Sequence, residues 1–403
     1  MTRPAYGAEM AGGLGALACV GRGGCTRITV VAGDVRSPPI SKLARLNQTI
    51  AFRSSYHSSR VPLEEIPMQM TWLLALLVAP ALGLSSALAQ TKQVTFAHQD
   101  MIVPFRVLMA TGEIEKSTGY KVSWKMFGGG GDVIKAMASG EVPIGEVGSS
   151  PATAAASQGL DIQIIWLLED IGNAEQLVAR NGSGVKALGD LKGRKVAAPF
   201  VSTTHYHLLV ALQDAKVNPK EVQVLNMRPP EIAAAWERGD IDATFIWDPV
   251  LTKVKATGTV LISSGDLAKK GKPTFDAIMV NRAWAEQHKE FLTKLITAIA
   301  RKDGEYSANM GKWTKDSDEV KAVAKIVGAK PEDVPAAMAA YDFVPAAEQA
   351  SAKWLGGGKS GGVATAMADT ALFLKEQGRI TEVAADYSRF VNPEFAQAAA
   401  AAK

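Results

Sequence analysis

The chain has 403 residues, of which 47% are hydrophobic, and a formal net charge of +4 at pH 7. Its length is typical of about two to three domains. Lys and Arg do not gather in a dense cluster, which argues against a nucleic-acid partner, because polyanion-binding proteins concentrate basic charge on one face.

An apolar run lies unusually far into the chain, in the segment MTWLLALLVAPALGLSSALAQ, Met70 to Gln90. It is too short to cross a membrane and ends in Ala87-Leu88-Ala89, the small-x-small pattern of a secretory cleavage site. We therefore expect residues 68–89 to be a signal peptide cut after Ala89, although no basic segment directly precedes it.

Residues 1–67 show no periodic pattern and are expected to be a non-structural upstream extension, with Met68 or Met70 as the true start. A genuine disordered N-terminal extension is the alternative. Both cysteines, Cys19 and Cys25, precede the signal, so the mature chain is expected to be periplasmic and to have no disulfide or lipid anchor.

Short apolar runs alternate with helical patterns from Val94 onward, which predicts an α/β fold of parallel sheets with helices on both faces. The expected strands are VTFAH, YKVSWKMF, IGEVG, IQIIWLLE, EQLVAR, LKGRKVAAP, EVQVLNM, IDATFIWDP and AIMVNR; VLMATGEIEKSTG is expected to be one helix ended by Gly119. Residues 90–181 and 275–403 are predicted to form one lobe and residues 182–274 another, hinged near Arg180 and Phe275 around a ligand cleft.

Three polar turns precede predicted helices, where unpaired N–H groups and the helix dipole favour anions. They are Ser149-Ser150 before Pro151, the run Ser202 to His205, and Gly128 to Gly131. Helix capping by the serines and threonines is the alternative interpretation. The glycine run lacks the Gly-Lys-Ser/Thr ending of a phosphate-binding loop, which argues against nucleotide binding.

Three carboxylates near the predicted cleft edges, Glu175, Asp248 and Asp276, indicate a site for a cation as well. Each could instead be a solvated turn residue. Trp247 could cover an ammonium group with its ring or be a core aromatic. The chain shows no metal-binding or hydrolase motif, and His205 and His207 cannot both face the cleft from one helix, so we expect no metal, no cofactor and no enzyme activity.

Several segments resemble the taurine-binding proteins of bacterial ABC importers: GSSPATAAASQGL, IGNAEQLV, KVAAPFVSTTHYHLL, PPEIAAAWERGDID, PTFDAIMV and ATALFLKEQGRI. The resemblance covers essentially the whole mature chain. It implies a type II periplasmic-binding fold with two lobes and a ligand cleft between them. It also implies a monomer that delivers taurine to a membrane permease driven by an ATPase.

The same resemblance implies roles for individual residues. Asp276 would pair with the ammonium, with Glu175 as a second acidic candidate, while Trp247 and Gln99 would line the pocket. Asp248 is a departure, because some relatives have a small apolar residue there. The sulfonate would be held by Ser149, Ser150, Ser202, Thr203 and Thr204, with His205 beside them. Two alternatives remain: a binding protein for other alkanesulfonates or sulfate esters, and an enzyme of the same fold like the thiamine-pyrimidine synthases.

Overall fold

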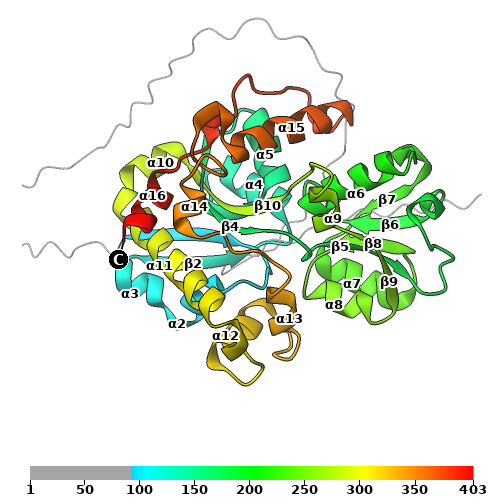
Figure 1. The fold of residues 1–403 in the computed structure, drawn as a ribbon, viewed down its shortest axis with the longest axis horizontal. Coiled ribbons are helices and arrows are strands. Elements are labelled where there is room, and N and C mark those ends of the chain that lie inside the picture. The colour runs from blue at the N-terminus through cyan, green and yellow to red at the C-terminus, as the bar shows by residue number, and fades with distance from the viewer. Residues whose placement is uncertain (1–91, 403) are drawn as a thin grey trace, which may run out of the picture. The chain divides into compact units, whose positions relative to one another are not determined.

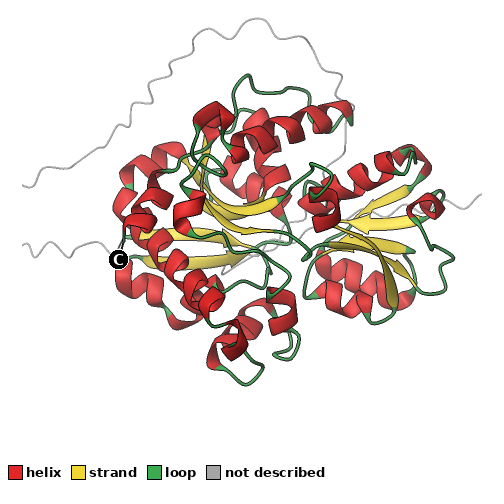
Figure 2. Cartoon of the chain, in the orientation of Figure 1, coloured by secondary structure: helices red, strands yellow, loops and turns green. Residues whose placement is uncertain are grey.

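The computed structural model describes residues 92–402, drawn as a ribbon in Figures 1 and 2. The predicted upstream extension (1–67) and signal peptide (68–89) lie outside the described residues. The described chain forms two five-stranded sheets, each flanked by helices, and the two sheets define a first and a second lobe. No helix in this range is both long enough and apolar enough to cross a membrane.

The first lobe contains the sheet β2-β1-β3-β10-β4. β3, β4 and β10 are buried almost throughout because helices cover both faces, whereas the edge strand β2 is largely exposed. The strands are β1 (Gln93–His98), β2 (Lys121–Met126), β3 (Ile144–Gly148), β4 (Ile162–Asp170) and β10 (Phe275–Asn281). The chain passes from the first lobe to the second after β4 and returns before β10, and we call these passages the first and second crossing. The helices before the first crossing are α2 (Phe105–Thr111), α3 (Glu113–Thr118), α4 (Gly130–Ala138) and α5 (Ser149–Ser157). Those after the second crossing are α10 (Arg282–Gln287), α11 (Lys289–Ala308), α12 (Asp318–Val327), α13 (Val334–Met338), α14 (Ala346–Gln349), α15 (Gly362–Glu376) and α16 (Glu394–Ala401).

The second lobe contains the sheet β7-β6-β8-β5-β9. It is built from one uninterrupted stretch of chain, so every one of its strands follows the first crossing and precedes the second. The strands are β5 (Gln176–Arg180), β6 (Lys195–Ala198), β7 (Gln223–Asn226), β8 (Ala243–Ile246) and β9 (Gly258–Ser263). The helices are α6 (Thr203–Asp214), α7 (Pro229–Arg238), α8 (Val250–Lys255) and α9 (Ser264–Ala268).

Both sheets are mixed, so the prediction of parallel sheets was wrong for the strands that follow each crossing. β10 runs antiparallel to β3 and β4, and β5 runs antiparallel to β8 and β9. Each enters its sheet directly from the other lobe without a covering helix, so no right-handed βαβ crossover imposes a parallel direction on it. β5 also pairs within the second sheet, which puts the first crossing between Asp170 and Gln176, ahead of the expected boundary at 181.

Local signals explain two helix boundaries. The stretch VLMATGEIEKSTG is two helices and not one, because Gly112 takes a left-handed conformation with φ 65° and ends α2. Gly119 ends α3 in the same conformation, at the predicted position. Ser202 caps α6 through a hydrogen bond from the His205 N–H to its hydroxyl, 3.0 Å long. Ser202, the first residue of the segment STTHYH, is therefore a helix-capping residue.

Candidate functional site

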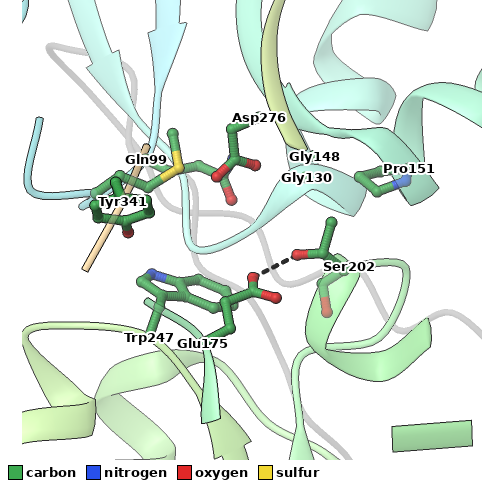
Figure 3. Close-up of a pocket in the computed structure, with 11 residues that line it drawn as sticks. Gln99, Gly130, Gly148, Pro151, Glu175, Ser202, Trp247, Asp276 and Tyr341 are labelled. Carbon is green, nitrogen blue, oxygen red and sulfur yellow. Dashed lines mark hydrogen bonds between the residues drawn. The ribbon is translucent and has the colours of Figure 1, made fainter. Parts of the chain in front are cut away.

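A small cavity lies where residues of both lobes meet, at the ends of several strands (Figure 3). Residues after β1, β3 and β8 reach it, and so does Asp276 near the start of the antiparallel β10. The enclosed space is about 10 Å³, room for about one water molecule. Its walls are formed by Gln99, Met101, Gly130, Gly148, Pro151, Glu175, Ser202, Thr203, Trp247, Asp276 and Tyr341.

Three helix starts converge on one side of this cavity. Gly130 begins α4, Gly148 precedes α5, and Ser202 precedes α6. The packing is close, since a Cβ on Gly148 would lie 2.6 Å from the Thr203 methyl group and a Cβ on Gly130 would lie 2.7 Å from Pro151. Helix starts carry unpaired N–H groups and partial positive charge, so this wall suits an anion.

The hydroxyl groups at the start of α6 are largely engaged within the protein. The Ser202 hydroxyl lies 2.5 Å from the Pro199 carbonyl and 2.8 Å from the Thr204 hydroxyl. The Thr203 hydroxyl donates to the Glu175 carboxyl, the dashed line in Figure 3. Backbone N–H groups at this helix start are therefore better placed than the hydroxyls to meet an incoming anion.

Two carboxyl groups line the cavity, and they differ in their partners. Figure 3 shows Asp276 and Gln99 on one side of the cavity and Glu175 and Trp247 on the other. Glu175 accepts from Thr203 and lies 3.2 Å from the Ser264 hydroxyl. Burial and, after it, the charge of Asp276 raise the pKa of Glu175 to about 8.

Asp276 has a different setting. No N–H group and no Ser, Thr or Tyr hydroxyl of residues 92–402 donates to its carboxyl, whose hydrogen-bond partner is the Glu169 carboxyl, and burial raises its pKa. Glu169 pairs with it across the β4–β10 ladder, and the two carboxyl groups contact each other. Burial, followed by the charge of Asp276, raises the pKa of Glu169 well above its usual range, so the pair carries its proton on Glu169 and its charge on Asp276. The cavity therefore has an ionisable acceptor on the wall away from α6.

A buried ion pair holds the loop that supplies Gln99 and Met101. Arg106 and Glu146 are both inaccessible to solvent, and the guanidinium forms two bonds to the carboxylate, 2.6 and 2.9 Å long. Arg106 also donates to the carbonyls of Gln99 and Met101, each at 3.1 Å. The loop position thus depends on a charge pair that does not itself touch the cavity.

Trp247 connects the two lobes at the cavity. Its indole N–H donates to Asp100 of the first lobe over 2.7 Å. Asp248, the next residue, accepts a hydrogen bond from the Thr252 N–H of α8 at 2.8 Å. It does not line the cavity, and its pKa is raised by burial.

Of the predicted site residues, the structure brings Gln99, Glu175, Ser202, Thr203, Trp247 and Asp276 to the cavity wall. It leaves Ser149, Ser150, Thr204, His205 and Asp248 outside that wall, although all are buried. Ser149 accepts from the Phe275 N–H at 3.4 Å. The His205 ring stacks on Phe200 at 4.3 Å between centroids, and burial lowers its pKa to about 4, so it is a neutral packing group.

The wall residues that the sequence did not indicate are Met101, Gly130, Gly148, Pro151 and Tyr341. Gly130 belongs to the predicted glycine turn, and Gly148 and Pro151 flank the predicted turn at Ser149 and Ser150, where hydroxyls were expected instead. Tyr341 comes from the loop between α13 and α14, far along the chain. No local pattern marks Tyr341 as a site residue, so only the fold identifies it.

Comparisons with known proteins agree with this architecture. Residues 116–303 match a family model described as NMT1/THI5 like. The chain is 36% identical to the taurine-binding periplasmic protein of Escherichia coli strain K12 over 79% of its own length and 97% of that protein.

Solved structures share the fold at low sequence identity. The alkanesulfonate-binding protein SsuA of Xanthomonas axonopodis pv. citri, bound to MOPS, matches with a TM-score of 0.61 at 20% identity, over 75% of this chain and 97% of that one. The desulfurization enzyme DSZB matches with a TM-score of 0.53 at 13% identity, over 76% and 98%. The predicted type II periplasmic-binding fold is confirmed, and the relatives are mainly binding proteins although the fold also includes an enzyme. The chain belongs to the NMT1/THI5-like periplasmic binding proteins, the family of the taurine-binding protein of E. coli.

Proposed function

We propose that this protein binds taurine in the cavity between its lobes and delivers it, as a periplasmic monomer, to the permease and ATPase of an ABC importer. The observation that carries the proposal is the polarity of the cavity. Three helix starts line the cavity, and Asp276, which pairs with Gly148 across β3 and β10, offers a carboxylate on the wall away from α6. Taurine has the matching charges, a sulfonate at one end and an ammonium at the other.

The sulfonate is assigned to the starts of α5 and α6, near Ser149, Ser150, Ser202, Thr203 and Thr204. A sulfonate spreads its charge over three oxygens and stays ionised at any physiological pH, so neutral N–H donors can hold it without a lysine or arginine. The ammonium is assigned to Asp276. Trp247, Gln99 and Tyr341 enclose the short carbon chain between them.

Entry requires the lobes to move. A cavity of about 10 Å³ does not hold a molecule the size of taurine, and the wall combines groups of both lobes. Opening about the two crossings, near residues 170–176 and 268–275, lets the ligand enter without unfolding either sheet, and the lobes then close around it. Release of the Trp247–Asp100 hydrogen bond accompanies that opening.

A binding role is favoured over catalysis by the groups at the cavity. Residues 92–402 contain no cysteine, and neither His205 nor His207 lines the cavity. The wall offers an anion site and a carboxylate, which are sufficient to hold a zwitterion.

Isothermal titration with taurine, ethanesulfonate, β-alanine and sulfate tests the proposal. We expect taurine to bind most tightly, ethanesulfonate to lose the contribution of the ammonium, and β-alanine to lose that of the sulfonate. Asp276→Asn should weaken taurine binding by about 30-fold or more, the usual cost of removing one partner of a buried charge pair, and leave ethanesulfonate little changed. Equal binding of ethanesulfonate and taurine by the unaltered protein would instead identify a general alkanesulfonate carrier.

A further inference from the structure

A chain of hydrogen bonds leads from the cavity to a histidine that the proposed function does not use. His207 is fully buried on α6, with Nε2 2.8 Å from the Lys272 carbonyl oxygen and Nδ1 2.7 Å from the Ser264 hydroxyl. Ser264 in turn lies 3.2 Å from Oε2 of Glu175, which is on the cavity wall. The Ser264 N–H also donates to the Glu175 backbone carbonyl at 2.9 Å, which fixes the two residues side by side.

The donor and acceptor of each hydrogen bond in this series follow from the Lys272 carbonyl, which cannot donate. The Lys272 carbonyl only accepts, so Nε2 of His207 must carry a proton. In a neutral imidazole Nδ1 is then the acceptor, and the Ser264 hydroxyl gives it its only proton. Ser264 has lone pairs left for Glu175, and a hydrogen bond between them needs a proton on Oε2.

The other oxygen of Glu175 completes the pattern, because Oε1 accepts from the Thr203 hydroxyl. A neutral carboxylic acid has one carbonyl oxygen to accept and one O–H to donate, and both are used here. We propose that Glu175 is a specificity residue that holds a proton, donates it to Ser264, and must stay neutral for an anion to bind beside it at the start of α6. This inference rests on the proposed function in that it places the anion at that helix start.

Charge explains why neutrality matters at this position. Thr203 touches Glu175 and also begins α6, so a carboxylate at Glu175 would stand directly beside the bound anion and repel it. The ionisable groups that face Glu175 are Asp276 from β10, Tyr341 from the loop after α13, and His207 through Ser264. None of them supplies a positive charge that would favour an ionised Glu175.

The pKa shifts of Glu175 and His207 agree with this arrangement. Burial and, after it, the charge of Asp276 raise the pKa of Glu175 to about 8, while the hydrogen bond from Thr203 acts in the opposite direction. Burial lowers the pKa of His207 to about 4. At pH 7 both groups are therefore neutral, and the single cavity charge is on Asp276.

Ethanesulfonate is the right probe, because its charge does not change with pH whereas the amine of taurine titrates. We expect its Kd to rise as pH increases through the pKa of Glu175, approaching about tenfold for each further pH unit. Glu175→Gln, which is permanently neutral, should bind without that dependence. The matched control is Asp303→Asn, another buried acid with a raised pKa but off the cavity wall, and it should keep the pH dependence.

The outcomes separate this inference from the proposed function. If the unaltered protein binds neither taurine nor ethanesulfonate, the proposed function fails and the anion role of Glu175 fails with it. If it binds ethanesulfonate with no pH dependence, or if the dependence survives in Glu175→Gln, only this inference is overturned.

Two further measurements test the placement of the proton without any ligand. Nitrogen-15 NMR of the unliganded protein at neutral pH should show His207 as the neutral tautomer protonated at Nε2; an imidazolium or an Nδ1-protonated ring would overturn the assignment. Ser264→Ala gives a second test in the pH profile of ethanesulfonate binding. Its midpoint should move to lower pH, because a neutral Glu175 loses its acceptor, whereas a shift to higher pH would mean that Ser264 donates to an ionised Glu175.

Discussion

Replacing Arg106 with methionine should destabilise the protein by about 3–5 kcal/mol, the usual cost of leaving a buried charge without its partner. The change leaves the Glu146 carboxylate, which has no solvent exposure, without its counter-ion. It also removes the donors to the Gln99 and Met101 carbonyls. Methionine keeps most of the apolar stem, so the loss is electrostatic and does not come from a cavity.

Urea unfolding followed by tryptophan fluorescence measures this loss as a lower midpoint at an unchanged slope. The double variant Arg106→Met/Glu146→Leu should recover most of the stability, because it removes the orphaned charge as well. Arg238→Met is the matched control: its ion pair with Asp240 is exposed, with side chains 62% and 52% accessible, and should cost about 1 kcal/mol or less. A loss below about 1 kcal/mol for Arg106→Met would refute the argument that this pair holds the loop.

Three further changes test closure and the response to acid. Gly148→Ala puts a methyl group 2.6 Å from that of Thr203 in the other lobe, so ligand affinity measured by titration should fall by about tenfold or more while each lobe stays folded. Asp100→Ala leaves the buried Trp247 N–H without its partner in the closed state and should weaken ligand binding by about tenfold; an unchanged Kd would show that this bond does not contribute to closure. Because the folded-state pKa of His207 is about 4, below the ordinary 6.5, its contribution to stability is complete above pH 6.5 and is lost as pH falls toward 4. The urea midpoint should fall over that range, and less so in His207→Gln.

Local chemistry made part of this structure predictable from the sequence. Ser202 caps its helix because the cap depends only on residues within one turn, and Gly119 ends a helix for the same kind of reason. Asp276 and Trp247 could be proposed as site residues because each lies next to a strand end. In each case the decisive atoms are near in sequence.

The remainder depends on contacts that sequence periodicity does not contain. β5 and β10 have ordinary strand patterns, and only their entry from the opposite lobe makes them antiparallel. Tyr341 reaches the cavity from a distant loop. Asp100 contributes because it accepts a hydrogen bond from Trp247 of the other lobe. The sequence marks Asp248 and Asp276 equally as acidic cleft residues, but Asp248 accepts a hydrogen bond from the Thr252 N–H of α8 and does not line the cavity.

The place of β10 in the first sheet has a consequence for the order in which the protein can be assembled. β10 lies between β3 and β4, yet it follows the whole second lobe in the chain. As the polypeptide emerges from N- to C-terminus, β5 to β9 can therefore complete their own sheet while β3 and β4 still lack the strand that joins them. A nascent chain that stops before Phe275 should contain a finished second lobe and two open strand edges in the first, the kind of edge that chaperones cover and aggregation exploits.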